Sequence, residues 1–469
     1  MNNSRRDFLR TTSIVSLGFI GLNQCVLSGC KVNTDPGFGF GPLLHREGDI
    51  LSLPKGFTAK VISRTGDKMS DGLFSPGNHD GMGIFGWKDG KVLLVRNHEL
   101  TPGSYGEGPF SSDKLLIDKI GKDRFYDFAK GGDRICVGGT TTFIYDEQTQ
   151  KIETEYLSLV GTVRNCSGGK TPWNSWITCE ETAFKKGDEK GELEKDHGYN
   201  FEVPATDKIG IADPVPITAM GRFVHESAAV HPATGIVYQT EDEGDGLFYR
   251  YLPNATGEMT TGSLHKGGKL QCLVINDWKS ADTRNYEGQK TDYFPEKKKF
   301  TVSWIDLDNV ENPDSDLRLR GHKMGAAVFS SGEGMSYGKD ELFFTASSGG
   351  RSNNGQVFRY TPSKYEGQPQ EKDAPGTLEL FIESRSIDTF RYCDNITVAP
   401  WGDVIVCEDS EDARIIGITP AGKAYVIAKN IGYRESEFAG PVFSPSGKTL
   451  FVNIQSPGLT LAVTGPWKS

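Results

Sequence analysis

The fold of this chain is decided by the stretch Asn395-Ile396-Thr397-Val398-Ala399-Pro400, which passes Gly402, continues as Val404-Ile405-Val406-Cys407-Glu408-Asp409 and is followed by Ile415-Ile416-Gly417-Ile418. It reads as a strand, a turn at Pro and Gly, a second strand, a polar loop and a third strand, because apolar and β-branched runs end in turn-forming residues. The same order recurs at residues 228–251, 326–360 and 440–463, and weaker copies lie at 83–99, 138–156 and 173–203. The chain is therefore expected to be all-β and built from repeats.

A unit of three strands cannot bury both faces of its sheet alone, so copies of it must pack around a common axis. We predict a single β-propeller domain over residues 43–469 with about six blades, and the pattern is also compatible with five or seven. Glycine, at 57 of 469 residues, fits the many tight turns that short strands require. The alternative left open is an all-β sandwich or a two-domain β protein.

The charge balance argues against a nucleic-acid partner. The chain has 52 basic and 62 acidic residues, a net charge of −10, and no block of five or more basic residues. Binding to a nucleic-acid backbone needs a concentrated basic face. We therefore expect no nucleic-acid partner.

The first thirty residues have the order of an export signal. Ser4-Arg5-Arg6-Asp7-Phe8-Leu9-Arg10 precedes an uncharged stretch at 11–22, which is too short to span a bilayer because about 20 residues are needed. The arginine pair resembles a twin-arginine signal, read by the twin-arginine export machinery, and Leu27-Ser28-Gly29-Cys30 resembles a bacterial lipobox. We expect a signal at 1–30, a linker at 31–42, and an exported protein that lies in the periplasm or is anchored to the cell envelope only through a lipid on Cys30.

Acidic residues directly follow several of the predicted strands. They stand in Asn97-His98-Glu99, Cys179-Glu180-Glu181, Glu241-Asp242-Glu243 and Cys407-Glu408-Asp409. The ends of these strands converge on one mouth of a propeller, where bare like charges would repel or raise one another's pKa. Bound cations remove that conflict, so we predict metal ligands at Glu99, Glu181, Glu241 and Glu408. Oxygen ligands favour Ca²⁺ or Mg²⁺, whereas a nearby thiolate or imidazole favours a transition metal.

One long motif runs Asn165-Cys166-Ser167-Gly168-Gly169-Lys170-Thr171-Pro172-Trp173-Asn174-Ser175-Trp176-Ile177-Thr178-Cys179-Glu180-Glu181-Thr182. Shorter ones are Asn97-His98-Glu99, Arg222-Phe223-Val224-His225-Glu226, Asp394-Asn395 and the closing stretch 438–467. Together they resemble the PhoX family of exported bacterial alkaline phosphatases over most of the chain from about residue 43. The resemblance implies a propeller whose axial mouth holds an oxide-bridged pair of iron ions (Fe³⁺) with calcium ions (Ca²⁺) and hydrolyses small phosphate monoesters.

The same resemblance assigns roles to residues of this chain. By it, Cys166 ligates iron, Glu181 and Glu226 bind metal, and Glu333 and Asp394 complete the calcium and iron shell. These roles are chemically sensible, because a cysteine in a Gly-rich loop can turn its sulfur toward a metal that holds it as a thiolate.

The remaining cysteines are expected to be structural. After the signal the chain carries Cys136, Cys166, Cys179, Cys272, Cys393 and Cys407. Three disulfides are arithmetically open to a protein outside the cytoplasm, but no spacing singles out a pairing. We expect mostly free, buried thiols, with Cys179 and Cys407 as packing residues.

One position departs from the pattern of the family. Members with demonstrated phosphatase activity usually carry an Arg two residues before the acid that corresponds to Glu333, and here that place is Ser331, which brings no positive charge. We predict that Arg351 binds phosphate in its stead and acts with Glu333 in catalysis, and Lys323 is the second candidate. Two alternatives stay open: a phosphodiesterase, or a lipid-anchored calcium-binding propeller without catalysis.

Overall fold

The computed structural model describes residues 38–110, 114–130, 134–255 and 257–468. The predicted signal, the lipobox and the linker up to residue 37 lie outside these residues. From Gly39 onward the chain forms one compact unit. None of its described helices is long and apolar enough to cross a membrane.

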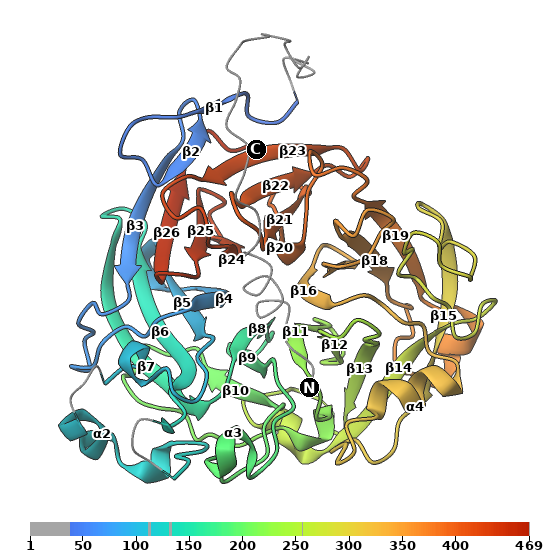
Figure 1. Ribbon diagram of the computed structural model, residues 1–469, viewed down its shortest axis with the longest axis horizontal. Helices are drawn as coiled ribbons and strands as arrows, with labels where there is room; N and C mark the ends of the chain where they lie inside the picture. Colours follow the sequence, from blue (N-terminus) through green and yellow to red (C-terminus); the bar gives the residue numbers. More distant parts are fainter. Residues whose placement is uncertain (1–37, 111–113, 131–133, 256, 469) are drawn as a thin grey trace, which may run out of the picture. The chain divides into compact units, whose positions relative to one another are not determined.

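Antiparallel sheets are arranged in a ring around a central axis (Figure 1). One blade consists of β4 (His79–Gly86), β5 (Lys91–His98), β6 (Gly138–Asp146) and β7 (Lys151–Thr162), and the next of β8 (Asn165–Lys170), β9 (Ser175–Glu180) and β10 (Asn200–Pro204). Two more consist of β11 (His225–Val230), β12 (Val237–Glu241), β13 (Phe248–Pro253) and β14 (Gly268–Ile275), and of β16 (Gly332–Tyr337), β17 (Leu342–Ala346), β18 (Gln356–Thr361) and β19 (Thr377–Glu383).

The last two blades combine strands from both ends of the described chain. One consists of β20 (Cys393–Val398), β21 (Val404–Glu408), β22 (Arg414–Ile418) and β23 (Ala424–Asn430), extended by β2 (Leu51–Pro54) and β1 (Leu43–Leu44). The other consists of β24 (Phe438–Phe443), β25 (Thr449–Ile454), β26 (Leu459–Thr464) and β3 (Thr58–Arg64). Pairing of β3 with β26 closes the ring, since it joins an early strand to the last one.

The predicted propeller is confirmed, with one difference in its sheets. The hydrogen-bonded sheets formed by the described residues number five, because β15 (Lys299–Asp306) pairs with both β14 and β19 and so joins two blades into one sheet of nine strands. Six innermost strands nevertheless surround the axis, and each contacts the next: β4, β8, β11, β16, β20 and β24. The weak repeats at 83–99 and 138–156 are the two halves of one blade rather than two blades.

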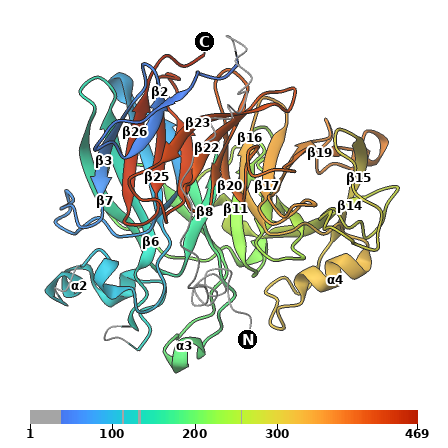
Figure 2. The same cartoon turned by 45° about the horizontal axis from the view of Figure 1, so that its top comes forward.

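Short helices occupy the connections. α2 (Lys114–Ile120), α3 (Asp188–Gly191) and α4 (Leu317–Met324) lie at the same end of the strands (Figure 2). The described 3₁₀ turns are η1 (Lys88–Gly90), η2 (Tyr105–Glu107), η3 (Lys122–Arg124), η5 (Thr218–Met220), η6 (Ser263–Lys266) and η7 (Pro369–Asp373). The loops after the second strand of each blade start at this end, which is where the sequence places its acidic clusters.

Candidate metal centre

Every innermost strand carries an irregularity close to its first residue. The pairing shifts by one residue between His79 and Met82, Asn165 and Gly168, His225 and Ala228, Gly332 and Met335, Cys393 and Ile396, and Ala439 and Val442. A bulge of this kind re-aims the side chain of the extra residue. In five strands the residue that follows the first paired residue is acidic or a cysteine: Asp80, Cys166, Glu226, Glu333 and Asp394.

These side chains meet in two groups that share one residue. The ligand atoms of Cys166, Glu181 and Glu226 all lie within 4.8 Å of one another, and so do those of Glu226, Glu333 and Asp394. Glu226 therefore belongs to both groups. The structure thus brings together five of the residues that the sequence predicts as ligands.

Burial and like charge make ionisation of these carboxyls unfavourable. Burial raises the pKa of Glu181 to about 8, although Arg164 opposes the shift, and burial with Asp409 raises that of Asp394 to about 8. The pKa of Glu226 is raised by burial and by Glu333. Bound cations would offset this cost of ionisation and hold the carboxyls as carboxylates.

The donors of the two groups fit the metals that the resemblance implies. A thiol beside carboxylates is a ligand set for a transition metal, and carboxylate oxygens alone suit calcium. Neighbouring polar groups already orient the oxygens: Ser347 Oγ donates to Glu333 at 2.6 Å, and Asn395 Nδ2 donates to Asp394 at 2.8 Å. The residues present are therefore compatible with an iron and calcium centre.

A third group lies on the blades next to the closure of the ring. Asp80, Glu99 and Glu437 bring carboxylate oxygens within 4.8 Å of one another. Gln455 Nε2 donates to Asp80 at 3.0 Å and to Glu99 at 2.7 Å. Glu99 was predicted from the sequence, whereas Asp80 and Glu437 were missed, although Asp80 stands at the start of its inner strand just as Cys166 does.

The family model for alkaline phosphatase PhoX matches residues 38–458. This chain belongs to the PhoX family. It is accordingly a phosphoester hydrolase of the alkaline phosphatase type. None of the curated proteins compared with this phosphatase matches it in sequence.

Among solved structures, PhoX from Pseudomonas fluorescens, in complex with the transition-state analogue vanadate, is similar to this phosphatase with a TM-score of 0.62 and 18% identity. The match covers 89% of this chain and 96% of the other, and it supports the fold. A gluconolactonase from Xanthomonas campestris matches with a TM-score of 0.36 and 10% identity, over 91% of this chain and 98% of the other. That similarity is too low to carry an argument.

Two of the predicted ligands of this PhoX-family protein lie outside the three groups. Glu241 accepts hydrogen bonds from Tyr249 Oη at 2.6 Å and from the Leu247 N–H at 3.1 Å. Glu408 is held by Arg414, whose Nη2 and Nε donate at 2.6 and 2.9 Å. Both are buried inside their blades, where hydrogen bonds satisfy them.

The acidic residues that directly follow Glu241 and Glu408 in the chain, Asp242 and Asp409, influence the pKa values of the candidate ligands. Burial is the main cause of the raised pKa of Glu333, Glu181 and Asp394; Asp242 raises the pKa of the first two further, and Asp409 that of the third. Successive side chains of a strand point to opposite sides, so the residue after a buried acid faces the axis. Of each adjacent acidic pair, the second member belongs to the mouth.

The cationic candidates also lie elsewhere. The Arg351 guanidinium stacks on the Tyr293 ring, 4.1 Å from its centroid, and the backbone N–H of Arg351 donates to Glu383 at 3.4 Å. Lys323 is exposed on α4. Among the described residues, neither side chain has a hydrogen bond or ion pair with the three groups. Ser331, at the position in question, accepts a hydrogen bond from Ser348 Oγ at 3.2 Å.

The six described cysteines are free and buried, as expected. Cys179 and Cys407 lie in β9 and β21 with no exposed surface, in agreement with a packing role. Cys166 differs from them because its sulfur lies within 4.8 Å of carboxylate oxygens of Glu226 and Glu181, and burial together with these charges raises the pKa of its thiol. A bound cation would offset those negative charges and favour the thiolate.

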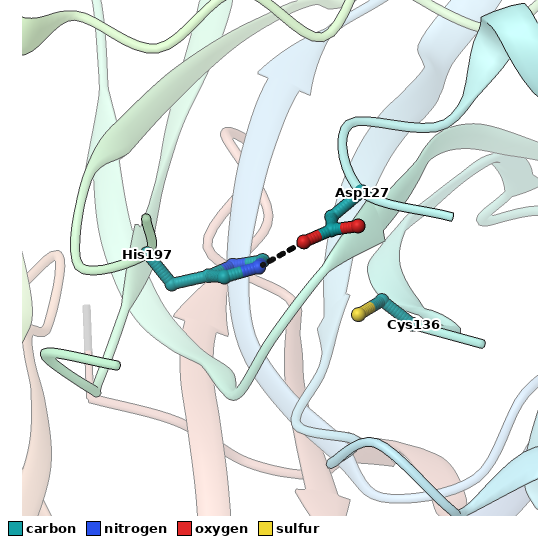
Figure 3. A group of neighbouring side chains, drawn as sticks. All are labelled: Asp127, Cys136 and His197. Carbon is teal, nitrogen blue, oxygen red and sulfur yellow. Dashed lines mark hydrogen bonds and ion pairs between the residues drawn. The ribbon is translucent and has the colours of Figure 1, made fainter. Parts of the chain in front are cut away.

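Figure 3 shows a fourth group of metal-ligand types. It consists of Asp127, Cys136 and His197, where His197 Nε2 lies 3.3 Å from Asp127 Oδ2 and His197 Nδ1 lies 2.7 Å from Glu180 Oε1. Burial alone would lower the pKa of His197, but Glu180 and hydrogen bonds to Asp127, Cys136 and Glu180 raise it well above its usual value.

Hydrogen bonding accounts for this group without a metal. Both ring nitrogens of a charged His197 donate to carboxylates, and Asp127 Oδ2 also accepts from the N–H groups of Glu194 and Lys195 at 2.9 and 2.8 Å. We interpret it as a buried ion triad that fixes Glu180 and, with it, the adjacent Glu181.

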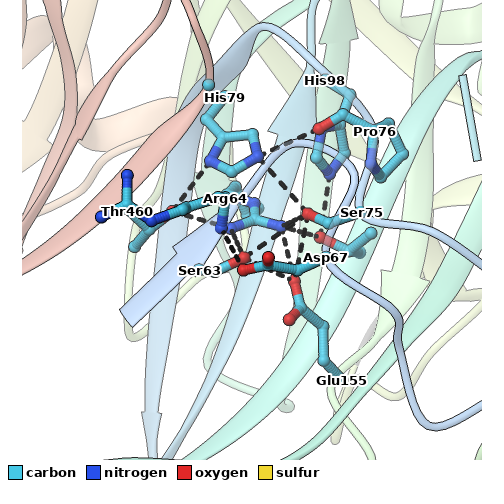
Figure 4. A network of polar contacts seen from close by, with 12 residues as sticks. Ser63, Arg64, Asp67, Ser75, Pro76, His79, His98, Glu155 and Thr460 are labelled. Carbon is cyan, nitrogen blue, oxygen red and sulfur yellow. Dashed lines mark hydrogen bonds and ion pairs between the residues drawn. The ribbon is translucent and has the colours of Figure 1, made fainter. Parts of the chain in front are cut away.

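A second buried network contains His79 and His98, which directly precede Asp80 and Glu99 in the chain (Figure 4). Its centre is Arg96, which has no exposed surface and donates through Nη2 to Glu155 at 2.7 Å and through Nη1 to Thr460 Oγ1 at 2.7 Å. Because Arg96, Glu155 and Thr460 lie on β5, β7 and β26, the network ties the first blade to the closing blade. His79, the residue immediately before Asp80 in the chain, forms a hydrogen bond between its Nδ1 and Thr460 Oγ1 at 3.1 Å.

Beyond the acidic residues, the inner strands line a cavity of about 390 Å³. Its walls include Gly83, Gly169, Ala229, Tyr337 and Val398, all further along their strands than the bulges. Ser167, which also lines this cavity, directly follows Cys166 in the chain and donates a hydrogen bond to Ser227 Oγ at 3.4 Å. The acidic mouth and the cavity therefore occupy different levels of the axis.

Proposed function

We propose that this PhoX-family protein hydrolyses phosphate monoesters at a centre of iron and calcium held by Cys166, Glu181, Glu226, Glu333 and Asp394. The observation that carries the proposal is the sharing of Glu226 between a thiol-containing group and an all-carboxylate group. Such a junction suits adjacent metals of different kinds, because thiolate selects transition metals and carboxylate oxygens select calcium. Asp80, Glu99 and Glu437 suit a further calcium ion.

When bound, the metals would neutralise phosphoryl oxygens and supply an activated oxygen nucleophile. The protein side chains then act mainly as ligands and as their supports. Ser347 holds Glu333, Asn395 holds Asp394, and Gln455 spans Asp80 and Glu99. Since the chain carries a net charge of −10, an anionic substrate would be disfavoured at this mouth without cations.

We also propose that the protein is exported by the twin-arginine route and anchored through Cys30. The support is the order of the N-terminal segment, from Arg5-Arg6 through the uncharged stretch to Leu27-Ser28-Gly29-Cys30. Export of a folded protein would allow metals to be inserted before translocation. Palmitate labelling of cells that express wild type or Cys30→Ala tests the anchor, and equal labelling of the two would contradict it.

A phosphodiesterase is the second candidate function, and Ser331 is the observation that favours it. Its hydroxyl contributes hydrogen bonding but no charge beside Glu333, and a phosphodiester carries one negative charge fewer than a monoester dianion. Diesters therefore need less cationic compensation at the same centre.

Metal analysis combined with a phosphatase assay tests the proposed function. Purified protein is expected to contain iron and calcium, to absorb visible light, and to cleave p-nitrophenyl phosphate faster than bis(p-nitrophenyl) phosphate. Faster cleavage of the diester would establish the second candidate. Protein with calcium but no iron, and without activity on either ester, would contradict both.

A further inference from the structure

The positions immediately before the innermost strands share a backbone feature. In four of these positions the backbone is left-handed: Asn78, Arg164, Ser331 and Tyr392 have φ of 43°, 52°, 51° and 46°. Residues other than glycine rarely adopt this conformation, and asparagine tolerates it best. Its recurrence at the same place in four blades marks these residues as a built feature of the mouth.

Each of these residues stands two positions before an axial side chain. Arg164 precedes Cys166 as Ser331 precedes Glu333, with φ values that differ by one degree. The pseudo-symmetry of the propeller therefore gives Arg164 and Ser331 equivalent places in different blades. Ser331 offers a hydroxyl at its place, and Arg164 offers a planar guanidinium at its own.

Arg164 also forms ion pairs with carboxylates of the groups of candidate ligands. Its Nη2 lies 3.2 Å from Glu99 Oε1 and also contacts Glu181 Oε2, so it spans the third group and the thiol-containing group. Among the ion pairs between described residues, only these two, both made by Arg164, involve a carboxylate of the three groups. Its side chain is 22% exposed, so part of it is accessible to solvent beside these carboxylates.

We infer that Arg164 binds the phosphoryl group of the substrate and supplies the cation that Ser331 does not. The inference rests on the proposed function and names a residue that the sequence did not single out. A guanidinium presents paired N–H donors that match two oxygens of a phosphoryl group. Once cations occupy the carboxylates of Glu99 and Glu181, their demand on the guanidinium falls, and an anionic substrate becomes its strongest acceptor.

The alternative is that Arg164 only holds Glu99 and Glu181 in place as metal ligands. The metal content of an Arg164 variant distinguishes the two roles, because only the alternative predicts that metal is lost. Arg164→Asn is the informative variant, because asparagine keeps the left-handed backbone while removing the charge. Arg320→Gln is the matched control: Arg320 also bridges two carboxylates, Asp308 at 2.7 Å and Asp316 at 2.9 Å, but lies on α4. Calorimetric titration of the metal-loaded proteins with inorganic phosphate gives a readout that does not depend on turnover.

We expect Arg164→Asn to weaken phosphate binding by about tenfold to a hundredfold with unchanged iron and calcium content, and Arg164→Lys to recover part of the loss. The Km for p-nitrophenyl phosphate should rise with it, and Arg320→Gln should behave as wild type. Unchanged phosphate binding in Arg164→Asn, or a loss that parallels loss of metal, would overturn the inference. A wild type that binds phosphate but cleaves no ester would instead refute the proposed function alone.

Discussion

Removal of the metals should make the free energy of unfolding of this protein fall as pH rises, an effect that the metal-loaded protein should lack. In the metal-free protein, burial and like charge raise the pKa of Glu181 from 4.5 to about 8 and that of Asp394 from 3.8 to about 8. Between the ordinary and the raised pKa, the folded state binds more protons than the unfolded state. The free energy of unfolding must then fall as pH rises through this window.

The slope follows from the number of protons. Each carboxyl that stays protonated in the folded state and ionises on unfolding contributes about 1.4 kcal/mol per pH unit, so Glu181 and Asp394 together contribute about 2.8 kcal/mol per unit. With metals bound, both groups are carboxylates in the folded state as well, and their contribution disappears. The gap in stability between loaded and chelated protein should therefore widen from about pH 5 to pH 8.

Urea unfolding at pH 5.5, 6.5 and 7.5, in fixed free calcium or in EDTA, measures this gap. Taking the difference between the two curves at each pH removes every titrating group that the metals do not touch. The m-values must agree between the two conditions if the gap is to report stability alone. A gap that is constant from pH 5.5 to 7.5 would refute the assignment of these carboxyls to the metals.

Three further predictions concern single residues. Cys166→Ser should abolish iron retention, measured by elemental analysis, whereas Cys179→Ser should retain it; equal iron in wild type and Cys166→Ser would remove the assignment. His197→Gln should lower the free energy of unfolding by about 3–5 kcal/mol in urea, because it leaves two buried carboxylates without their cation, and a loss under 1 kcal/mol would argue against the ion triad. Asp242→Asn should reduce calcium or iron content while Glu241→Gln leaves it unchanged, and the reverse pattern would contradict the orientation of these acids.

The repeat of strand, turn and strand was enough to predict the propeller, but not how its sheets are joined. Residues 83–99 and 138–156 read as two units because a connection of about forty residues with its own helix separates β5 from β6. The link made by β15 rests on Phe300 pairing with Leu378, a contact between blades that no local pattern encodes. Such long-range pairings follow from the packing of the whole ring.

The candidate site was predictable where a motif named the residue, as for Cys166, Glu181 and Glu226. It was less predictable where only acidity was used. Glu241 and Asp242 are adjacent acids, and the sequence does not tell which of them faces the axis until the register of β12 with β11 is known. Asp80 escaped notice because its bulge appears only when the starts of all inner strands are compared.

The central claim is that Cys166 and the carboxylates around Glu226 hold iron and calcium for phosphoester hydrolysis. Anomalous X-ray diffraction from crystals of the purified protein, recorded on both sides of the iron absorption edge, tests it most directly. The account predicts an iron peak within bonding distance of Cys166 Sγ and between Glu181 and Glu226. A peak at Asp127, Cys136 and His197 instead, or the absence of iron beside Cys166 in an active preparation, would contradict it.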